Sequence, residues 1–266
     1  MTAIAITGAN GRMGQALIRA IASDPQATLA AALVRPGHER LGLDAGVMAG
    51  LKPLGVALSA TLPTDTDVVV DFTSPAATVA LAAQCARQGL PLVVGTTGLS
   101  ESDKAALHAA ARQTAIVFAP NMSVGVNLLL GLVALASEVL GDSVDVEIIE
   151  AHHRHKKDAP SGTALALGEA AAKALGRDLS QCAVYGREGI TGERDRQTIG
   201  FATVRGGDII GEHTVLFAGE GERIELGHKA HNRDTFASGA LRAAHWLAAG
   251  QPPGLYDMQD VLRLRK

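Results

Sequence analysis

One stretch of the chain, residues 147–163, is dense in side chains that could do acid–base chemistry; it reads EIIEAHHRHKKDAPSGT. Five consecutive positions carry three histidines, an arginine and a lysine: His152, His153, Arg154, His155 and Lys156. Imidazoles exchange protons near neutral pH, and an ammonium attracts anions. The stretch is therefore a candidate site for an anionic ligand that is protonated during a reaction.

The elements on either side of this stretch would position it. Residues 144–149, VDVEII, are apolar and β-branched at enough positions to predict a buried strand. Beyond Pro160, Ser161 is a typical helix N-cap, and the following pattern predicts a helix over residues 162–175. The N-terminus of such a helix offers free backbone N–H groups and a partial positive charge, which suit an anion.

Two other interpretations of the basic stretch stay open. A run of basic residues most often forms a solvated face, and His152 with His155 could instead bind a metal ion. Against a solvated face, the run follows a buried strand directly and precedes a helix start. Against a metal, there is no cysteine nearby, and the positive charges of Arg154 and Lys156 would repel a cation. We therefore expect no metal.

Composition is typical of a soluble α/β protein, since 47% of the 266 residues are hydrophobic, 19% are charged and 30 are glycine. The net charge of −3 gives no bulk attraction to nucleic acid. We expect no apolar run long enough to span a bilayer, no membrane partner and no export signal. The two isolated cysteines, Cys85 and Cys182, fit a reducing cytoplasm.

The N-terminal half begins with a glycine-rich turn. A buried strand over residues 3–7 is followed by GANGRMG, residues 8–14, and by an amphipathic helix to about residue 22. A glycine turn in this context lets pyrophosphate approach the backbone at a helix N-terminus, which is typical of dinucleotide binding. The spacing is GxxGxxG rather than GxGxxG, and a tight turn without a ligand is the alternative.

Further strands over residues 28–34, 67–72, 90–94 and 115–119, with helices between them, predict a doubly wound parallel sheet. The carboxyl ends of such strands share one edge, where ligands bind. We expect three segments to line a cofactor crevice at that edge: Phe72-Thr73, Gly95-Thr96-Thr97 and Ala119-Pro120-Asn121.

The end of the second strand bears on the choice of cofactor. A carboxylate there would hold the ribose 2′-hydroxyl of NAD, but the strand ends at Val34 and Arg35 follows. An arginine without a carboxylate neighbour suits the 2′-phosphate of NADP, unless it is an ordinary surface arginine. We expect NADPH to be preferred, with NADH as the second cofactor.

After residue 123 the pattern changes. An apolar helix over residues 126–140 precedes the basic stretch, and the polar segment 176–198 predicts a long loop. Strand-like segments over 199–205, 208–217 and 222–227, joined by glycine turns, predict a meander. Together with residues 144–149 they would form a second, mostly antiparallel sheet. Both faces of this sheet are fairly apolar, so we expect a partner subunit.

The predicted architecture is α/β, with a Rossmann-type doubly wound parallel sheet and a second α+β domain that has a mostly antiparallel open sheet. Residues 1–123 would form the dinucleotide-binding domain, and residues 124–232 the substrate-binding and oligomerisation domain. Residues 233–266 would form a C-terminal helix and tail that return to the first domain.

The basic stretch also resembles a known signature. EAHHRHKKDAPSGTA, residues 150–164, is similar to the signature of the 4-hydroxy-tetrahydrodipicolinate (dihydrodipicolinate) reductases of lysine and diaminopimelate biosynthesis. The turn at residues 8–14, GTTG at 95–98, NMSVGVN at 121–127 and GER at 192–194 resemble the same family. This resemblance implies a homotetrameric enzyme that reduces a cyclic dicarboxylate with NADH or NADPH.

The family pattern also implies roles for individual residues. His152 would be the acid/base residue and Lys156 a proton donor, while His153, Gly162 and Thr163 would bind substrate. The residues implied in cofactor binding are Gly8, Ala9, Asn10, Gly11, Arg12, Met13, Arg35, Gly95, Thr96, Thr97, Ala119, Pro120, Asn121 and Met122. Many relatives carry Glu where Val34 stands, and its absence argues against equal use of the two cofactors.

Two other classes of protein are the alternatives. One is another NADP-dependent oxidoreductase, such as a semialdehyde or amino-acid dehydrogenase. Such enzymes often use a catalytic cysteine, but Cys85 is expected within a helix and Cys182 in a polar loop. The other is a non-catalytic nucleotide sensor or metal-binding protein, which zinc analysis and an assay of NAD(P)H oxidation would distinguish.

Overall fold

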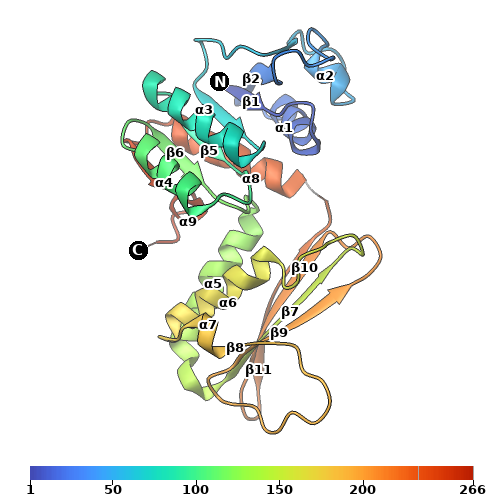
Figure 1. Cartoon of the computed structure of the whole chain (residues 1–266), viewed down its shortest axis with the longest axis vertical. Helices are drawn as coiled ribbons and strands as arrows, with labels where there is room; N and C mark the ends of the chain where they lie inside the picture. Colours follow the sequence, from blue (N-terminus) through green and yellow to red (C-terminus); the bar gives the residue numbers. More distant parts are fainter. Residues whose placement is uncertain (233, 266) are drawn as a thin grey trace. The chain divides into compact units, whose positions relative to one another are not determined.

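The computed structural model describes residues 1–232 and 234–265, which form two compact units (Figure 1). Unit 1 contains Met1–Val124 and the described part of the C-terminal segment, and unit 2 is Gly125–Asn232. Unit 2 is thus inserted into the chain of unit 1. The first and last residues of the predicted C-terminal segment, 233 and 266, lie outside the described residues.

Unit 1 is built on a parallel sheet of seven strands in the order β12-β6-β5-β4-β1-β2-β3. The strands are β1 (Thr2–Thr7), β2 (Ala27–Leu33), β3 (Leu58–Ser59), β4 (Val68–Asp71), β5 (Leu92–Val94), β6 (Ala115–Phe118) and β12 (Gly254–Tyr256). β1 lies between β2 and β4, so the strand order reverses beside it. This is the point at which doubly wound sheets bind ligands.

Helices cover both faces of this sheet, which explains why its central strands are apolar on both sides. α1 (Arg12–Ser23) packs with α8 (Asp234–Ala248) on one face, and α3 (Pro75–Gln88) packs with α4 (Glu101–Ala110) on the other. The short helices α2 (Ala45–Met48) and α9 (Met258–Val261) complete the unit. α8 alone buries Leu241 and Leu247, each worth about 1.5–3 kcal/mol of hydrophobic free energy.

Unit 2 has a five-stranded sheet in the order β11-β10-β7-β9-β8. Its strands are β7 (Asp145–His152), β8 (Ala183–Tyr185), β9 (Ile199–Arg205), β10 (Gly211–Ala218) and β11 (Arg223–Ala230). α5 (Val124–Leu140), α6 (Gly162–Ala174) and α7 (Leu179–Cys182) lie on one face of it (Figure 1). Burial alternates strictly along β10 because only that face is covered.

The α/β class and the doubly wound parallel sheet are confirmed, whereas the second sheet differs from expectation in its topology. β10 pairs antiparallel with β7 and β11, but β7 pairs parallel with β9, and β9 pairs parallel with β8. The sheet is therefore mixed rather than mostly antiparallel. Of the predicted meander, the antiparallel pair β10–β11 is confirmed, but β9 does not pair with β10 because β7 lies between them.

The segment 176–198 is not a continuous loop, as had been expected. It contains α7 and β8, and Cys182 ends α7 rather than lying in a loop. The side chain of Asp178 caps α7 by accepting a hydrogen bond from the backbone N–H of Ser180. A single helical turn followed by three strand residues is too short to show a period in the sequence.

α5 corrects a second expectation. The helical segment Val124–Ser143 has 20 residues and a mean hydropathy of 1.9, so by length and composition it could cross a membrane. One such helix is a weak indication, because helices within a protein core meet the same criteria. Here Leu129 and Val133 pack into the core of unit 2, while Leu132 and Val139 are 41% and 73% exposed in the single chain.

Candidate active site

The end of β7 carries a paired carboxylate and imidazole. Glu150 and His152 are two residues apart on the strand, so both side chains point to the face that the helices cover. Glu150 is 1% exposed and His152 is 8% exposed. Nδ1 of His152 lies 2.6 Å from Oε2 of Glu150. A carboxylate can only accept, so the proton of the neutral imidazole is on Nδ1.

Both oxygens of Glu150 have further donors. Arg205, at the end of β9, donates from its two terminal nitrogens to Oε2 at 2.8 Å and Oε1 at 2.7 Å. The backbone N–H of Ser161 donates to Oε1 at 3.0 Å. Burial raises the pKa of Glu150, but the hydrogen bonds from Arg205, His152 and Ser161 outweigh burial and lower that pKa below its usual value. Glu150 is therefore a carboxylate at neutral pH.

The environment of His152 favours the neutral ring. Burial lowers the pKa of His152, the hydrogen bond and charge of Glu150 raise it, and the charges of Lys156 and Arg205 lower it again. The balance is a pKa below the usual value for histidine. Among the residues that the structure describes, Nε2 has no hydrogen-bond partner. The ring thus presents a nitrogen lone pair for proton exchange with a ligand.

Lys156 lies in the loop between β7 and α6. Its backbone N–H donates to the carbonyl of His153 at 3.1 Å, and Nζ donates to Oδ1 of Asp158 at 2.9 Å. Its charge is close enough to depress the pKa of His152, as noted above. The loop therefore brings a neutral imidazole and a cationic ammonium to the end of the same strand.

The start of α6 completes this group. The Ser161 side chain caps the helix by accepting from the backbone N–H of Ala164 at 3.2 Å, so the predicted cap is confirmed. The Ser161 hydroxyl also lies 3.0 Å from Nε2 of His213 on β10. Burial, with the nearby charge of His152, lowers the pKa of His213 to about 4 and so keeps that ring neutral. Gly162 and Thr163 then form the first turn of a helix whose N-terminus favours anions.

In unit 1, close packing at the glycine turn explains why glycine is needed there. Gly8 has φ of +64°, and a Cβ on it would lie 3.0 Å from Cγ2 of Thr73. A Cβ on Gly14 would lie 2.4 Å from the carbonyl oxygen of Gly8, so α1 approaches the turn as closely as a backbone can. At the three glycine positions of this turn no side chain stands between a phosphate and the backbone N–H groups at the start of α1.

The structure gathers the predicted cofactor residues at the carboxyl edge of the parallel sheet. The turn 8–13 follows β1, residues 95–97 follow β5, and residues 119–122 follow β6. Arg35 follows β2 and is exposed, next to the buried Val34. The predicted substrate residues lie in unit 2, at the end of β7 and the start of α6.

Several functional candidates were missed from the sequence. In unit 1, Asp71 ends β4 fully buried and accepts from the hydroxyls of Thr7 at 2.5 Å and Thr73 at 2.7 Å. It also accepts from Thr78 and, at 3.1 Å, from Thr96. A carboxylate closing an apolar strand was the signal that could have revealed it. In unit 2 the missed groups are Glu150, Arg205 and His213, of which only Glu150 had a signal, its spacing of two from His152.

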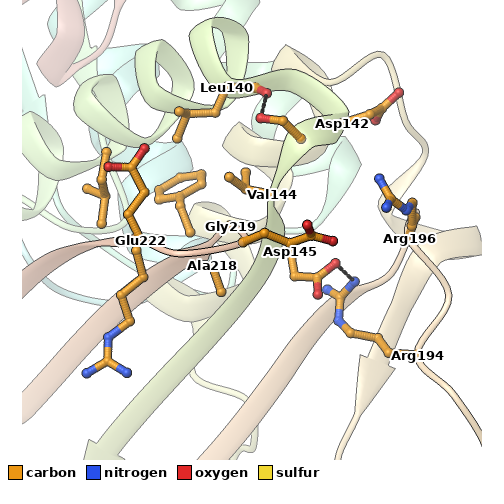
Figure 2. Close-up of a pocket in the computed structure, with 14 residues that line it drawn as sticks. Leu140, Asp142, Val144, Asp145, Arg194, Arg196, Ala218, Gly219 and Glu222 are labelled. Atoms are coloured by element: carbon orange, nitrogen blue, oxygen red, sulfur yellow. Dashed lines mark hydrogen bonds and ion pairs between the residues drawn. The ribbon is translucent and has the colours of Figure 1, made fainter.

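A cavity of about 730 Å³ in unit 2 lies far from Glu150 and His152 of the same unit. Figure 2 shows it at the start of β7, where Arg194 forms an ion pair with Asp145 at 2.7 Å. β7 separates it from His152 by roughly 23 Å, at about 3.3 Å per residue. Its lining mixes three arginines with four acidic residues and includes none of the candidate site residues. No group of three or more His, Cys, Asp or Glu within the described chain is arranged to hold a metal ion.

Comparison with protein families and relatives gives one consistent match. Residues 2–122 match the family model described as dihydrodipicolinate reductase, N-terminus, and residues 125–262 match dihydrodipicolinate reductase, C-terminus. The 4-hydroxy-tetrahydrodipicolinate reductase of Hahella chejuensis is 60% identical over 268 residues, covering 100% of both chains. That of Alkalilimnicola ehrlichii is 62% identical over 266 residues, covering 99% of each chain.

Solved structures agree in fold. A dipicolinate-bound dihydrodipicolinate reductase from Paenisporosarcina sp. TG-14 is 26% identical and superposes with a TM-score of 0.76, over 98% of each chain. GenD2 from gentamicin A biosynthesis, solved in complex with NAD, is 16% identical with a TM-score of 0.60 over 99% of this chain and 90% of its own. This second likeness concerns the fold alone.

Proposed function

The chain belongs to the dihydrodipicolinate reductase family, and from this membership we infer that it reduces 4-hydroxy-tetrahydrodipicolinate with a pyridine nucleotide, in lysine and diaminopimelate biosynthesis. It is an NAD(P)H-dependent oxidoreductase. The observation that carries this function beyond the family match is the end of β7, where a paired histidine, a lysine and a helix N-terminus meet in one unit. That combination suits an anionic substrate that must gain a proton.

His152 and Lys156 are the residues proposed for proton transfer. The neutral His152 ring is held by Glu150 through Nδ1, so Nε2 is the atom that exchanges a proton with the substrate. A bound dicarboxylate would add negative charge beside the ring and raise its pKa, so that binding favours the imidazolium. Lys156 offers an ammonium in the same loop, either to supply a proton or to stabilise negative charge.

His153, Gly162 and Thr163 are proposed to bind the substrate carboxylates. The helix start supplies backbone N–H groups, and the space beside Gly162 is open, since a Cβ built there would meet no atom within 4 Å. A dipicolinate-bound relative with the same fold supports a cyclic dicarboxylate as the ligand class.

The residues at the carboxyl edge of the parallel sheet are proposed to hold the cofactor. The turn 8–13 and the start of α1 would bind the pyrophosphate, and residues 95–97 and 119–122 would line the nicotinamide half. The bare backbone at Gly8 and Gly14 fits this role. When bound, the reduced nicotinamide supplies the hydride. We further propose a preference for NADPH over NADH, because Val34 cannot grip a 2′-hydroxyl and Arg35 can pair with a 2′-phosphate.

A homotetramer built through unit 2 is part of the proposal, as is a cytoplasmic location. Only one face of the five-stranded sheet is covered by helices, and Ile149 and Val204 on the other face are 42% and 48% exposed. Large apolar side chains in this position are typical of a surface that another subunit covers.

The proposed cytoplasmic location fits the cysteines, since both are free thiols, as a reducing compartment requires.

The dehydrogenase alternative that depends on a cysteine gains no support. Cys85 is fully buried, and burial with the charge of Asp71 raises the pKa of its thiol to about 12, so no thiolate forms at neutral pH.

The decisive experiment for the proposed reaction is consumption of reduced cofactor, followed by its absorbance, with substrate freshly made by the preceding synthase. Oxidation that depends on this substrate is expected, and its absence would refute the assignment.

A further inference from the structure

We propose that Glu150 is the positioning residue of this site: one buried carboxylate fixes the tautomer of His152 and holds the start of α6 in register with it. The inference rests on the proposed catalytic role of His152. Glu150 itself is 1% exposed, so it is not placed to contact a ligand directly. Its effect is exerted through its neighbours, and three contacts carry the inference.

The first contact determines which ring nitrogen faces the substrate. The 2.6 Å bond between Oε2 and Nδ1 requires the proton on Nδ1, which leaves Nε2 as the lone pair. Without an acceptor at this place, the two tautomers of a neutral imidazole would compete, and the ring could turn about its χ2 angle. Glu150 thus selects a single tautomer and a single ring orientation before a ligand arrives.

The second contact links the imidazole to the anion-binding helix. Oε1 accepts the backbone N–H of Ser161 at 3.0 Å, and the hydroxyl of Ser161 caps α6. The same carboxylate therefore holds the proton-exchanging ring through one oxygen and the first turn of α6 through the other. A shift in Glu150 would move the two ligand-binding parts relative to each other.

The third contact, from Arg205, offsets the negative charge of Glu150, which would otherwise repel an anion at this site. Arg205 binds both oxygens of Glu150 and also donates to the carbonyl of Asp158 at 2.6 Å. A bidentate arginine is a strong and directional partner for a buried carboxylate. It allows a negative group to sit behind His152 without repelling a dicarboxylate, and it fastens the loop that carries Lys156.

Strand register explains how these groups meet. One residue from each of four neighbouring strands lies directly opposite the next across the sheet: Thr203 on β9, Glu150 on β7, His213 on β10 and His228 on β11. Arg205 pairs with His152 two residues further along the same strands. The charged or titratable groups that face the imidazole are therefore Glu150, Lys156, Arg205 and His213.

The test uses two substitutions whose effects on His152 have opposite signs. Glu150→Gln removes the negative charge that raises the pKa of His152, so this pKa falls further and part of the ring population moves to the Nε2–H tautomer. Arg205→Gln removes a positive charge that lowers the pKa of His152, so this pKa rises. Nitrogen NMR of the histidine rings reports both tautomer and titration without using activity, and the His152 limb of the pH–rate profile should move in the same two directions.

Glu150→Gln should also lower kcat by about 100-fold, a typical contribution of a positioned acid or base. The matched control is Glu147→Gln, which removes a carboxylate from the same strand that is also held by two arginines, Arg187 and Arg194. Glu147→Gln should change the free energy of unfolding but leave the tautomer and pKa of His152, and the pH dependence of kcat, as they are in the wild type.

The proposal is overturned if Glu150→Gln leaves the tautomer and pKa of His152 unchanged, or if both substitutions move that pKa in the same direction. Should Glu150→Gln fail to fold, the His152 tautomer of the wild type decides: a proton on Nδ1 supports the proposal, and a proton on Nε2 refutes it. Full activity in His152→Gln would instead refute the proposed catalytic role, and the NMR result would still test Glu150 separately.

Discussion

Cofactor preference gives the most quantitative prediction, through the substitution Arg35→Ala. Arg35 directly follows Val34 at the end of β2, and its side chain has no hydrogen-bond or ion-pair partner among the described residues. Binding a 2′-phosphate would therefore not require breaking an existing ion pair. A charge-assisted hydrogen bond contributes about 1.5–3 kcal/mol.

The exposure of Arg35 decides where in this range the effect should fall. Solvent and salt screen an exposed charge, so we expect the lower end, about 1.5 kcal/mol. This corresponds to roughly a tenfold weakening of NADPH binding in Arg35→Ala, with little change for NADH. The gap between the two cofactors should narrow because NADPH binds less well, not because NADH binds better.

Calorimetric titration of each cofactor into the wild type and the variant measures this directly. Arg40→Ala is the control, since Arg40 is an exposed arginine in the same loop that already lies 3.8 Å from Glu39. Arg12, in the glycine turn, is the competing candidate for the phosphate contact. Equal affinities of the wild type for NADPH and NADH, or equal weakening of both in Arg35→Ala, would contradict the role given to Arg35.

Three further predictions concern chemistry, the cofactor edge and assembly. His152→Gln and Lys156→Ala should each lose most turnover while cofactor affinity persists, and near-normal steady-state rates in both would disprove the mechanism. Asp71→Asn should lower the free energy of unfolding by about 1–3 kcal/mol, because an amide cannot accept from all four threonine hydroxyls. Denaturant titration measures this free energy, and the exposed Asp67→Asn is the control. A loss of stability in Asp71→Asn no larger than that in Asp67→Asn would argue against this role of Asp71. Light scattering should give a tetramer for the wild type and smaller, folded species for Ile149→Lys on the open face of the sheet; a monomeric wild type at micromolar concentration would exclude this assembly.

Local signals explain what the sequence could predict. The start of α6 was predicted because an N-cap acts within three residues, and the hydroxyl of Ser161 does accept from the N–H of Ala164. The parallel sheet was predicted because strands buried on both faces read as short apolar runs between helices. Residues near the ends of these strands were predicted to gather at one edge, which follows from parallel strand direction alone.

What escaped prediction depends on contacts between distant parts of the chain. Arg205 meets Glu150 across 55 residues and Thr7 meets Asp71 across 64, and no periodicity encodes such pairs. The order of the second sheet was missed for the same reason, since β9 and β10 are joined by a short glycine turn yet lie on opposite sides of β7. β12 has only three residues, and its pairing with β6 shows only in the folded sheet.

The insertion of unit 2 into unit 1 has a consequence for synthesis on the ribosome. α8 packs against α1 and against β4, β5 and β6, but it is translated only after the whole of Gly125–Asn232. At about 5–20 residues per second, that insertion delays α8 by roughly 5–20 s. During this interval the part of the sheet face that α8 later covers stays exposed beside α1, and β12 has not yet been made. A ribosome that pauses within unit 2 therefore prolongs the period in which the nascent chain is most prone to aggregate.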